Sequence, residues 1–158
     1  FYFKKHKRNS YISTSYRRIM ITVKIQKEQF NPQKILKNAE KDKKYGALVS
    51  FIGSVREETN GGKVKKLFIE HYKNMAEKII YKTALNAEKK WNLDYCYIIH
   101  RYGTLKAGES IVMVITCSKH RKEAYAANQY IIDWLKINAP FWKKEIFENK
   151  SKWVEQTL

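Results

Sequence analysis

The chain has 158 residues, of which 44% are hydrophobic and 14% aromatic. This composition suffices for the core of one domain, so a chain that is disordered throughout is excluded. The net charge of +17 favours acidic proteins, polyanions or phosphorylated small molecules as partners, without distinguishing among them. No apolar run approaches the roughly 18 residues that cross a bilayer, so a transmembrane helix is excluded.

A basic segment precedes the first predicted element. Residues 1–19 contain six basic residues, no acidic residue and no periodicity. Met20 opens a strand, so we interpret residues 1–19 as an extension that is disordered or foreign to the natural chain, with a targeting segment as the alternative. The segment has no long apolar stretch, which argues against secretion. The domain is expected to span residues 20–158 and to lie in the cytoplasm.

The first half of the chain predicts a strand over 21–25, a helix and two further strands. Asn31 followed by Pro32 is typical of a helix start, because Asn caps free backbone N–H groups and Pro is favoured in the first turn. This helix should run to about Asp42. The next expected elements are a buried strand over 46–54, a flexible loop over 57–63 around Asn60-Gly61-Gly62, and a strand over 64–72.

The second half predicts a helix, two strands, another helix and a hairpin. Asn74 and Glu77 resemble a capping box, and apolar residues then recur at helical spacing. Ser118 is a suitable N-cap for a helix over 119–138, which Pro140 ends. The strands are expected at 95–101 and 110–117, joined by a turn with Gly103 and Gly108, and at 142–147 and 152–155. This mixed order predicts an α+β fold.

The two cysteines, Cys96 and Cys117, lack the spacing of a metal site. Both fall in predicted strands, so we interpret them as buried, reduced thiols of an intracellular protein. A disulfide between them stays open at this point. A cysteine nucleophile is disfavoured, because neither residue has an obvious base beside it.

The start of the last predicted helix departs from the usual pattern. Lys119, His120, Arg121 and Lys122 follow the predicted N-cap directly. Cations in this position oppose the helix dipole, by about 0.3–1 kcal/mol each when exposed. Such departures are typical of functional sites, and free backbone N–H groups would complete an anion site. A solvated basic turn in a lysine-rich chain is the alternative.

The segment after this helix combines amines with aromatic side chains. Lys136 lies in the last predicted helical turn, and Phe141 and Trp142 can wall a pocket. Lys143 and Glu145 follow with the same facing, because the side chains of a strand alternate. A lysine beside apolar walls has a lowered pKa, which suits a nucleophile or a proton carrier.

Further candidates lie near the ends of predicted strands. Arg56 follows a buried strand, and His100 and His71 lie near the ends of two others, where a core position is the alternative for each histidine. The candidates at element ends suggest a pocket for a phosphate-bearing ligand, with an amine or a carboxylate carrying out the chemistry. These candidates are Arg56, His120, Arg121, Lys136 and Lys143.

Six short motifs occur in a fixed order between residues 46 and 155. They are Gly46-Ala47 through Phe51 with Gly53 and Val55-Arg56; Glu70-His71-Tyr72; His100-Arg101-Tyr102-Gly103 with Gly108-Glu109; Ser118-Lys119-His120-Arg121; Asp133-Trp134-Leu135-Lys136 with Ala139-Pro140-Phe141-Trp142-Lys143 and Glu145; and Trp153-Val154-Glu155. Each motif alone is weak, whereas six with ordered spacing are specific. Together they resemble the family of molybdopterin synthase catalytic (large) subunits.

The resemblance implies an α/β-hammerhead with an additional antiparallel β subdomain. It implies a homodimer that binds a small ubiquitin-like carrier protein at each end, in a heterotetramer, through a C-terminal Gly-Gly thiocarboxylate. The implied reaction transfers sulfur from this thiocarboxylate to cyclic pyranopterin monophosphate and forms molybdopterin, a step of molybdenum cofactor biosynthesis. No cofactor, metal ion, nucleic acid or membrane is implied for the chain itself.

The resemblance also assigns roles to single residues. Lys136 is expected to be the main catalytic lysine, close to the terminal carbonyl of the carrier. Lys143 is expected to assist in proton transfer, and Glu145 to orient the lysines or relay a proton. The substrate phosphate and pterin are expected to contact Arg56, His120 and Arg121, with Phe51 lining the pocket. Converging cations suit a reaction that brings two anions together.

Two other functions stay open. The first is a scaffold that binds the carrier without catalysis, against which the presence of both Lys136 and Lys143 speaks. The second is a nucleic-acid-binding module, which the net charge and the aromatic content permit. The basic residues are spread along the chain, however, and no recognised nucleic-acid motif occurs.

Overall fold

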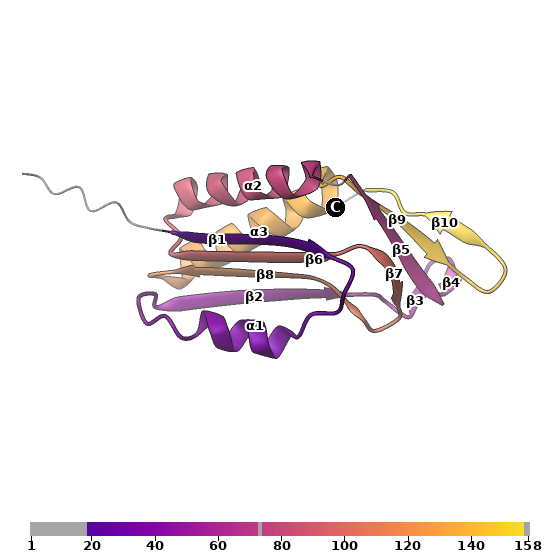
Figure 1. Cartoon of the computed structure of the whole chain (residues 1–158), viewed down its shortest axis with the longest axis horizontal. Helices are drawn as coiled ribbons and strands as arrows, with labels where there is room; N and C mark the ends of the chain where they lie inside the picture. Colours follow the sequence, from indigo (N-terminus) through magenta and orange to yellow (C-terminus); the bar gives the residue numbers. More distant parts are fainter. Residues whose placement is uncertain (1–18, 73, 157–158) are drawn as a thin grey trace, which may run out of the picture.

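The computed structural model describes residues 19–72 and 74–156 (Figure 1). The helices are α1 (Pro32–Ala39), α2 (Met75–Trp91) and α3 (Arg121–Asn138). The strands are β1 (Met20–Gln26), β2 (Ala47–Ser54), β3 (Glu58–Thr59), β4 (Gly62–Lys63), β5 (Lys66–His71), β6 (Tyr95–Arg101), β7 (Gly103–Lys106), β8 (Ser110–Ser118), β9 (Phe141–Ile146) and β10 (Ser151–Trp153). The predicted α+β class is confirmed. No described helix is long and apolar enough to cross a membrane.

The predicted N-terminal extension is described only at its end. Residues 1–18 lie outside the described residues. Ile19, which the prediction also placed in the extension, is partly buried and packs against the core of the domain.

Four strands form the first sheet, in the order β1-β6-β8-β2. β1 runs parallel to β6, and the other two pairs are antiparallel. Figure 1 shows α2 and α3 on one face of this sheet and α1 on the other. The central strands β6 and β8 are therefore apolar on both faces, because helices cover both.

The two faces of the first sheet bury separate cores. The larger core lies beneath α2 and α3 and includes Ile80, Val114 and Ile131. The smaller core lies beneath α1 and includes Met113 and Ile115. Successive residues of β8 thus enter opposite cores, as the alternation of side chains along a strand requires.

A second, antiparallel sheet has the strand order β10-β9-β5-β7. It lies beyond one end of the first sheet, and its strands run obliquely to those of the first sheet (Figure 1). Only Ala139 and Pro140 separate α3 from β9, so the last helix leads directly into the second sheet. The predicted additional antiparallel subdomain is confirmed.

Two segments that were predicted as loops contain strands. β3 and β4 form a short hairpin within the predicted flexible loop 57–63. β7 occupies the first part of the predicted turn after β6 and pairs with β5. The prediction missed β7 because so short a strand depends on a partner that is distant in the sequence, and not on a local pattern.

Two predicted helix caps are absent. Asn74 precedes α2, but its backbone is left-handed (φ 71°) and its side chain makes no capping hydrogen bond. Ser118 is the last residue of β8, and α3 begins at Arg121. Ser118 pairs with Ala47 across the sheet, which extends β8 by one residue into the predicted cap position.

The predicted cap of the first helix is present. Oδ1 of Asn31 accepts a hydrogen bond from the backbone N–H of Lys34 at 2.9 Å, and Pro32 begins the helix. The helix is shorter than predicted, because it ends at Ala39 and not at Asp42.

Cys96 and Cys117 lie on opposite faces of the first sheet. Cys96 belongs to the larger core and Cys117 to the smaller one. Both thiols are free and buried, as predicted, and a disulfide between them is excluded by their opposite facing. Burial raises the pKa of each thiol to about 12, which disfavours a thiolate nucleophile.

Candidate active site

Lys136 and Lys143 lie together at the junction of α3 and β9. Lys136 is in the last turn of α3, and the chain then passes through Ala139 and Pro140 into β9, which carries Lys143. Ala139 is extended (φ −67°, ψ 137°), as expected of a residue before proline. Both lysines line two cavities, of about 190 and about 60 Å³.

The larger cavity is mainly apolar apart from the two amines. β8 and α3 supply aliphatic walls, β2 supplies an aromatic ring and β6 supplies an imidazole. The lining includes Phe51, His100, Val112, Val114, Ile132 and Leu135. Phe51, which the resemblance assigns to the substrate pocket, lies on the wall of this cavity. Apolar walls strengthen the attraction between an amine and a bound anion, because they exclude water.

Gly53 keeps this cavity open. A Cβ atom at this position would lie 2.9 Å from Cγ1 of Val112. Packed side chains do not approach so closely, so any larger residue would displace the cavity walls.

The environment of Lys143 differs from that of Lys136. Lys136 is exposed at the helix end, whereas Lys143 is half-buried. Burial lowers the pKa of Lys143, and the positive charge of Lys136 lowers it further. More of the Lys143 amine is therefore neutral at a given pH, which suits a group that accepts and returns a proton.

His100 forms part of the cavity wall. The sequence left open whether this residue has a functional or a core position. In the structure the side chain is buried, at 3% exposed, and it also lines the cavity. Burial, followed by the charge of Lys143, lowers the pKa of His100 to about 3. The imidazole is therefore neutral at physiological pH.

The C-terminal segment lines the smaller cavity, which the sequence did not predict. Glu155 and Gln156 border this cavity beside the two lysines. The Gln156 amide donates to the backbone oxygens of Ala139 and Phe141 at 3.1 and 2.7 Å, which ties the segment to the turn between α3 and β9. No local pattern could have indicated this, because the contacts depend on the fold.

Arg56 lies near the larger cavity without lining it. It lies two residues after Ser54, which is the last residue of β2 and part of the cavity wall. The N–H of Val55 donates to the backbone oxygen of Glu109 at 2.9 Å, which holds the chain just before Arg56. The Arg56 side chain is exposed.

His120 and Arg121 lie at the opposite end of β2. Ser118 pairs with Ala47, the first residue of β2, whereas the cavity lies at Ser54, the last. β2 has 8 residues, so its ends are roughly 23 Å apart. Within one chain, the structure therefore does not bring His120 and Arg121 to the lysines.

The cationic helix start is also smaller than predicted. Because α3 begins at Arg121, Lys119 precedes the helix, and Glu123 adds an acidic residue to the first turn. His120 occupies the N-cap position without a side-chain capping bond. The unfavourable charges of the first turn are thus limited to Arg121 and Lys122, with Glu123 offsetting them in part.

Glu145 is engaged away from the cavities. Its Oε2 accepts a hydrogen bond from the Thr59 hydroxyl at 3.1 Å, and it lines neither of the two lysine cavities. The alternation along β9 places it on the same side as Lys143, as predicted. Its carboxylate nevertheless points to the β3–β4 hairpin.

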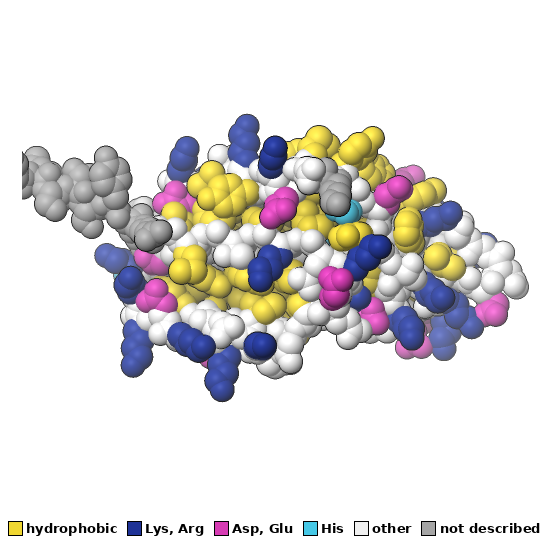
Figure 2. Space-filling view, viewed as in Figure 1, with side chains coloured by type: hydrophobic (Ala, Val, Ile, Leu, Met, Phe, Trp, Pro, Cys, Tyr) yellow, Lys and Arg dark blue, Asp and Glu magenta, His cyan; other side chains and the backbone are white. Residues whose placement is uncertain are grey.

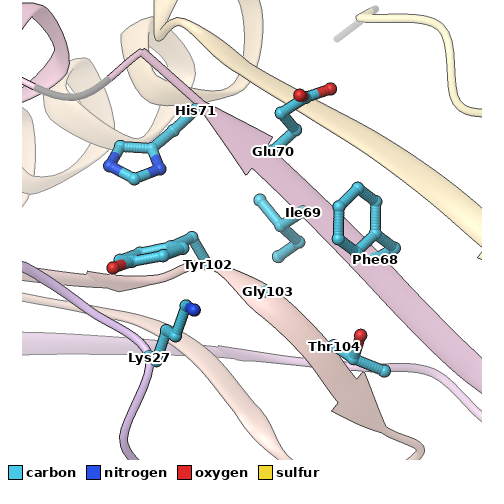
Figure 3. Close-up of a pocket in the computed structure, with 8 residues that line it drawn as sticks. All are labelled: Lys27, Phe68, Ile69, Glu70, His71, Tyr102, Gly103 and Thr104. Carbon is cyan, nitrogen blue, oxygen red and sulfur yellow. The ribbon is translucent and has the colours of Figure 1, made fainter.

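A separate pocket of about 490 Å³ lies between β5, β7 and the end of β1. Figure 3 shows the rings of His71 and Tyr102 beside one another, with Lys27 next to Tyr102. The two ring centroids are 4.2 Å apart, and Nζ of Lys27 lies 5.6 Å from the Tyr102 centroid. Neither catalytic lysine candidate lines this pocket.

Fold and site together define a class of protein. Two amines, one with a lowered pKa, and a neutral imidazole line one apolar cavity at the end of the first sheet of this α+β fold. Such a site suits an enzyme that binds an anionic group and moves protons with lysine.

Comparisons with known proteins identify the family. The family model described as MoaE protein matches residues 25–138. The chain is 37% identical over 135 residues to the molybdopterin synthase catalytic subunit of Haemophilus influenzae, covering 85% of this chain and 90% of that protein. For the Bacillus subtilis subunit the identity is 40% over 134 residues, and the coverage is 85% of each chain. The chain belongs to the family of molybdopterin synthase catalytic subunits.

Solved structures agree with this family. Molybdopterin synthase from Staphylococcus aureus matches with a TM-score of 0.76 at 37% identity, covering 84% of this chain and 96% of that chain. A complex of subunits 1 and 2 of molybdopterin-converting factor from Helicobacter pylori matches with a TM-score of 0.72 at 25% identity. The match covers 85% of this chain and 90% of that chain. The family predicted from the motifs is confirmed, and with it an enzymatic role in molybdenum cofactor biosynthesis.

The visible face of the molecule gives the nucleic-acid alternative no support. Figure 2 shows Lys and Arg side chains scattered over the visible face and interspersed with Asp and Glu. A module that follows a nucleic-acid backbone would gather its cations in a patch or stripe.

Proposed function

We propose that the chain transfers sulfur from the C-terminal thiocarboxylate of a small ubiquitin-like carrier protein to cyclic pyranopterin monophosphate. In each transfer, the thiocarboxylate sulfur forms a bond to a carbon of the pterin side chain, and one carbon–oxygen bond at the same carbon breaks, with the oxygen leaving as water or with the phosphate group. Water then attacks the carbonyl carbon, the carbon–sulfur bond to the carrier breaks, and the carrier leaves as a carboxylate. Two transfers from two carriers supply the two sulfurs of molybdopterin. The observation that carries the proposal is the convergence of Lys136 and Lys143 on one cavity.

The two lysines have different proposed roles. Lys136, exposed at the end of α3, contacts the terminal carbonyl of the carrier and stabilises the negative charge that develops on its oxygen. Lys143 has the lowered pKa, so it exchanges protons during attack and release. For Glu145 we propose an indirect contribution, orienting Lys143 through β9, because its carboxylate is engaged by Thr59.

The substrate phosphate and pterin are proposed to contact Arg56, His120 and Arg121. A homodimer would bring these three residues together, although His120 and Arg121 lie far from Arg56 within one chain. β2 is an edge strand, which pairs only with β8 among the described residues. If two copies pair through antiparallel β2 strands about a two-fold axis, the first residue of one strand lies beside the last residue of the other. His120 and Arg121 of the second copy then approach Arg56 and the lysines of the first.

We propose a small carrier subunit as the partner at each end of this dimer. The solved Helicobacter pylori complex of two subunits supports a two-component assembly. An exposed aromatic patch supports a protein partner in addition: Tyr72, Trp142 and Trp153 are 63%, 43% and 48% exposed. Large exposed rings that cluster on one surface are typical of binding sites, and Trp142 lies on β9 directly before Lys143.

A conversion assay tests the proposal. Purified chain, thiocarboxylated carrier and cyclic pyranopterin monophosphate are combined, for wild type, Lys136→Ala and the control Lys37→Ala. Lys37 lies in the last turn of α1, as Lys136 lies in the last turn of α3, so the control matches the helix position. We expect product from wild type and from the control, and almost none from Lys136→Ala, which still binds the carrier. A folded wild-type chain that binds the carrier and forms no product would instead indicate a scaffold.

A further inference from the structure

Among the residues that line the larger lysine cavity, His100 alone carries an imidazole. It is the second-last residue of β6, a central strand of the first sheet, and is 3% exposed. The proposed sulfur transfer gives this side chain no role. A polar ring on the wall of a reactive cavity presents a hydrogen-bonding nitrogen to the groups that occupy this cavity.

One hydrogen bond determines the tautomer of His100. Nδ1 lies 2.8 Å from the backbone oxygen of Arg101. A carbonyl oxygen only accepts, so Nδ1 carries the proton and Nε2 of the neutral ring keeps its lone pair. Within the described residues, this is the one hydrogen bond that the ring makes.

A row of rings holds the plane of this imidazole. Phe141 stacks on His100 with a centroid distance of 3.9 Å and an interplanar angle of 9°. His71 lies 6.1 Å from Phe141, and Tyr102 lies 4.2 Å from His71. The far end of the row is visible in Figure 3. A ring that is stacked and hydrogen-bonded cannot rotate freely, so the Nε2 lone pair has a defined direction.

The same row connects His100 to Lys143. Phe141 and Lys143 are two residues apart on β9, so their side chains share one side of that strand. His100 and Lys143 both line the larger cavity, and Phe141 borders the smaller cavity beside Lys143.

We propose that His100 is a positioning residue for Lys143. When the Lys143 amine turns toward the cavity to exchange protons, the Nε2 lone pair accepts a hydrogen bond from it and holds it there. Because the imidazole stays neutral, it orients the amine without adding a second charge. The link to catalysis rests on the proposed sulfur transfer, whereas the hydrogen bond itself does not.

Other ionisable groups surround the Lys143 amine and bear on any measurement of its pKa. Lys136 comes from α3 and Glu155 from the segment after β10, and both border the smaller cavity. His71 of β5 pairs with Phe141 across the neighbouring strands and interacts electrostatically with His100. The test therefore changes His100 alone and leaves these three groups in place.

Two variants separate positioning from packing. His100→Phe keeps an aromatic ring on Phe141 and removes the acceptor. His100→Gln loses the ring and places an amide oxygen near the former Nε2. A packing role predicts that Phe is tolerated and Gln is harmful, whereas a positioning role predicts the reverse order. Thermal unfolding of both variants identifies the folded proteins, and Phe141→Leu provides a third variant that removes the stack and keeps the imidazole.

The first readout is the pKa of Lys143, measured without turnover. Acylation by an amine-selective reagent is followed at Lys143 by mass spectrometry as a function of pH. A neutral acceptor binds the ammonium form more strongly than the amine form, so it raises the Lys143 pKa. We expect His100→Phe to lower this pKa by about one unit, and His100→Gln to stay close to wild type. An unchanged pKa in a folded His100→Phe would overturn the proposal.

The second readout is turnover. We expect kcat of His100→Phe to fall about tenfold while KM for the carrier is unchanged, with His100→Gln retaining most activity. Activity that is retained in the Phe variant and lost in the Gln variant would assign His100 to packing. If wild type itself forms no product, the proposed function fails, but the acylation profiles still decide whether His100 holds the Lys143 amine.

Discussion

Arg101 and Glu109 form an ion pair at the end of the first sheet, with Nη1 3.0 Å from Oε2 and side chains only 6% and 21% exposed. The Arg101 guanidinium also donates to the backbone oxygens of Lys27 and Ser110, and Glu109 accepts from Gln29. This network ties β6 and β8 to the segment that follows β1. It also holds the strand end whose backbone oxygen fixes the His100 ring.

We expect Arg101→Met to destabilise the fold by about 3 kcal/mol, because it leaves a partly buried carboxylate without its cation. Glu109→Gln should lower the stability less than Arg101→Met near neutral pH. It should also change how the stability falls at acidic pH. Burial opposes ionisation of Glu109, but hydrogen bonds, first from Arg101, hold its pKa below the usual value of 4.5. Its stabilising contribution is therefore present above the unfolded-state pKa and is lost as the pH falls through the folded-state pKa.

Urea unfolding between pH 3 and pH 7 measures both effects of this ion pair. Wild type should lose stability on acidification more steeply than Glu109→Gln. Equal slopes for the two proteins would show that the ionised Glu109 contributes nothing.

The charge of Lys136 should be measurable at Lys143. Burial is the larger cause of the lowered Lys143 pKa, and the positive charge of Lys136 is the second. Lys136→Ala removes the like charge, so the pKa of Lys143 should rise, by up to about one unit. The pH profile of Lys143 acylation measures this shift, with Lys37→Ala as the control that should leave it unchanged. A profile that coincides with wild type would mean that the two amines do not interact.

Sites shared between two copies should be restored by mixing inactive variants. Lys136→Ala lacks the main catalytic lysine, and His120→Ala lacks a proposed phosphate contact from the other copy. After exchange of subunits, half of the dimers contain one chain of each kind, and each of these has one intact site. We expect activity to return to about a quarter of wild type. If each site were complete within one chain, one site of a mixed dimer would carry Lys136→Ala and the other His120→Ala. The mixture would then stay as inactive as its components.

The aromatic patch should contribute to carrier binding. Trp142→Ala and Trp153→Ala each remove a large exposed ring, and we expect each to weaken carrier affinity by about 2 kcal/mol, or roughly thirtyfold. Tyr125→Ala on α3 is the control, because Tyr125 is 64% exposed and lies outside the second sheet. Isothermal titration with the carrier measures the affinities. Tryptophan variants that bind the carrier as tightly as the Tyr125 variant would show that the carrier binds another surface.

Local patterns predicted much of the fold correctly. The long strands of the first sheet and all three helices follow from hydrophobic periodicity and from Asn31-Pro32 and Pro140 as boundaries. The errors fall where a distant partner decides the structure. Ser118 looks like a helix cap, but its pairing with Ala47 makes it a strand residue. β7 looks like a turn, but β5 pairs with it.

The sequence by itself determined the family, through six ordered motifs, and the nearness of Lys136 to Lys143, because only a short turn separates the two. It did not determine what else reaches their cavity. The register of β2 against β8 sends His120 to the far end of the sheet, the β3–β4 hairpin engages Glu145, and the row of rings from Tyr102 to Phe141 fixes His100 beside the amines. These relationships join residues that are distant in the chain, so only tertiary packing could decide them.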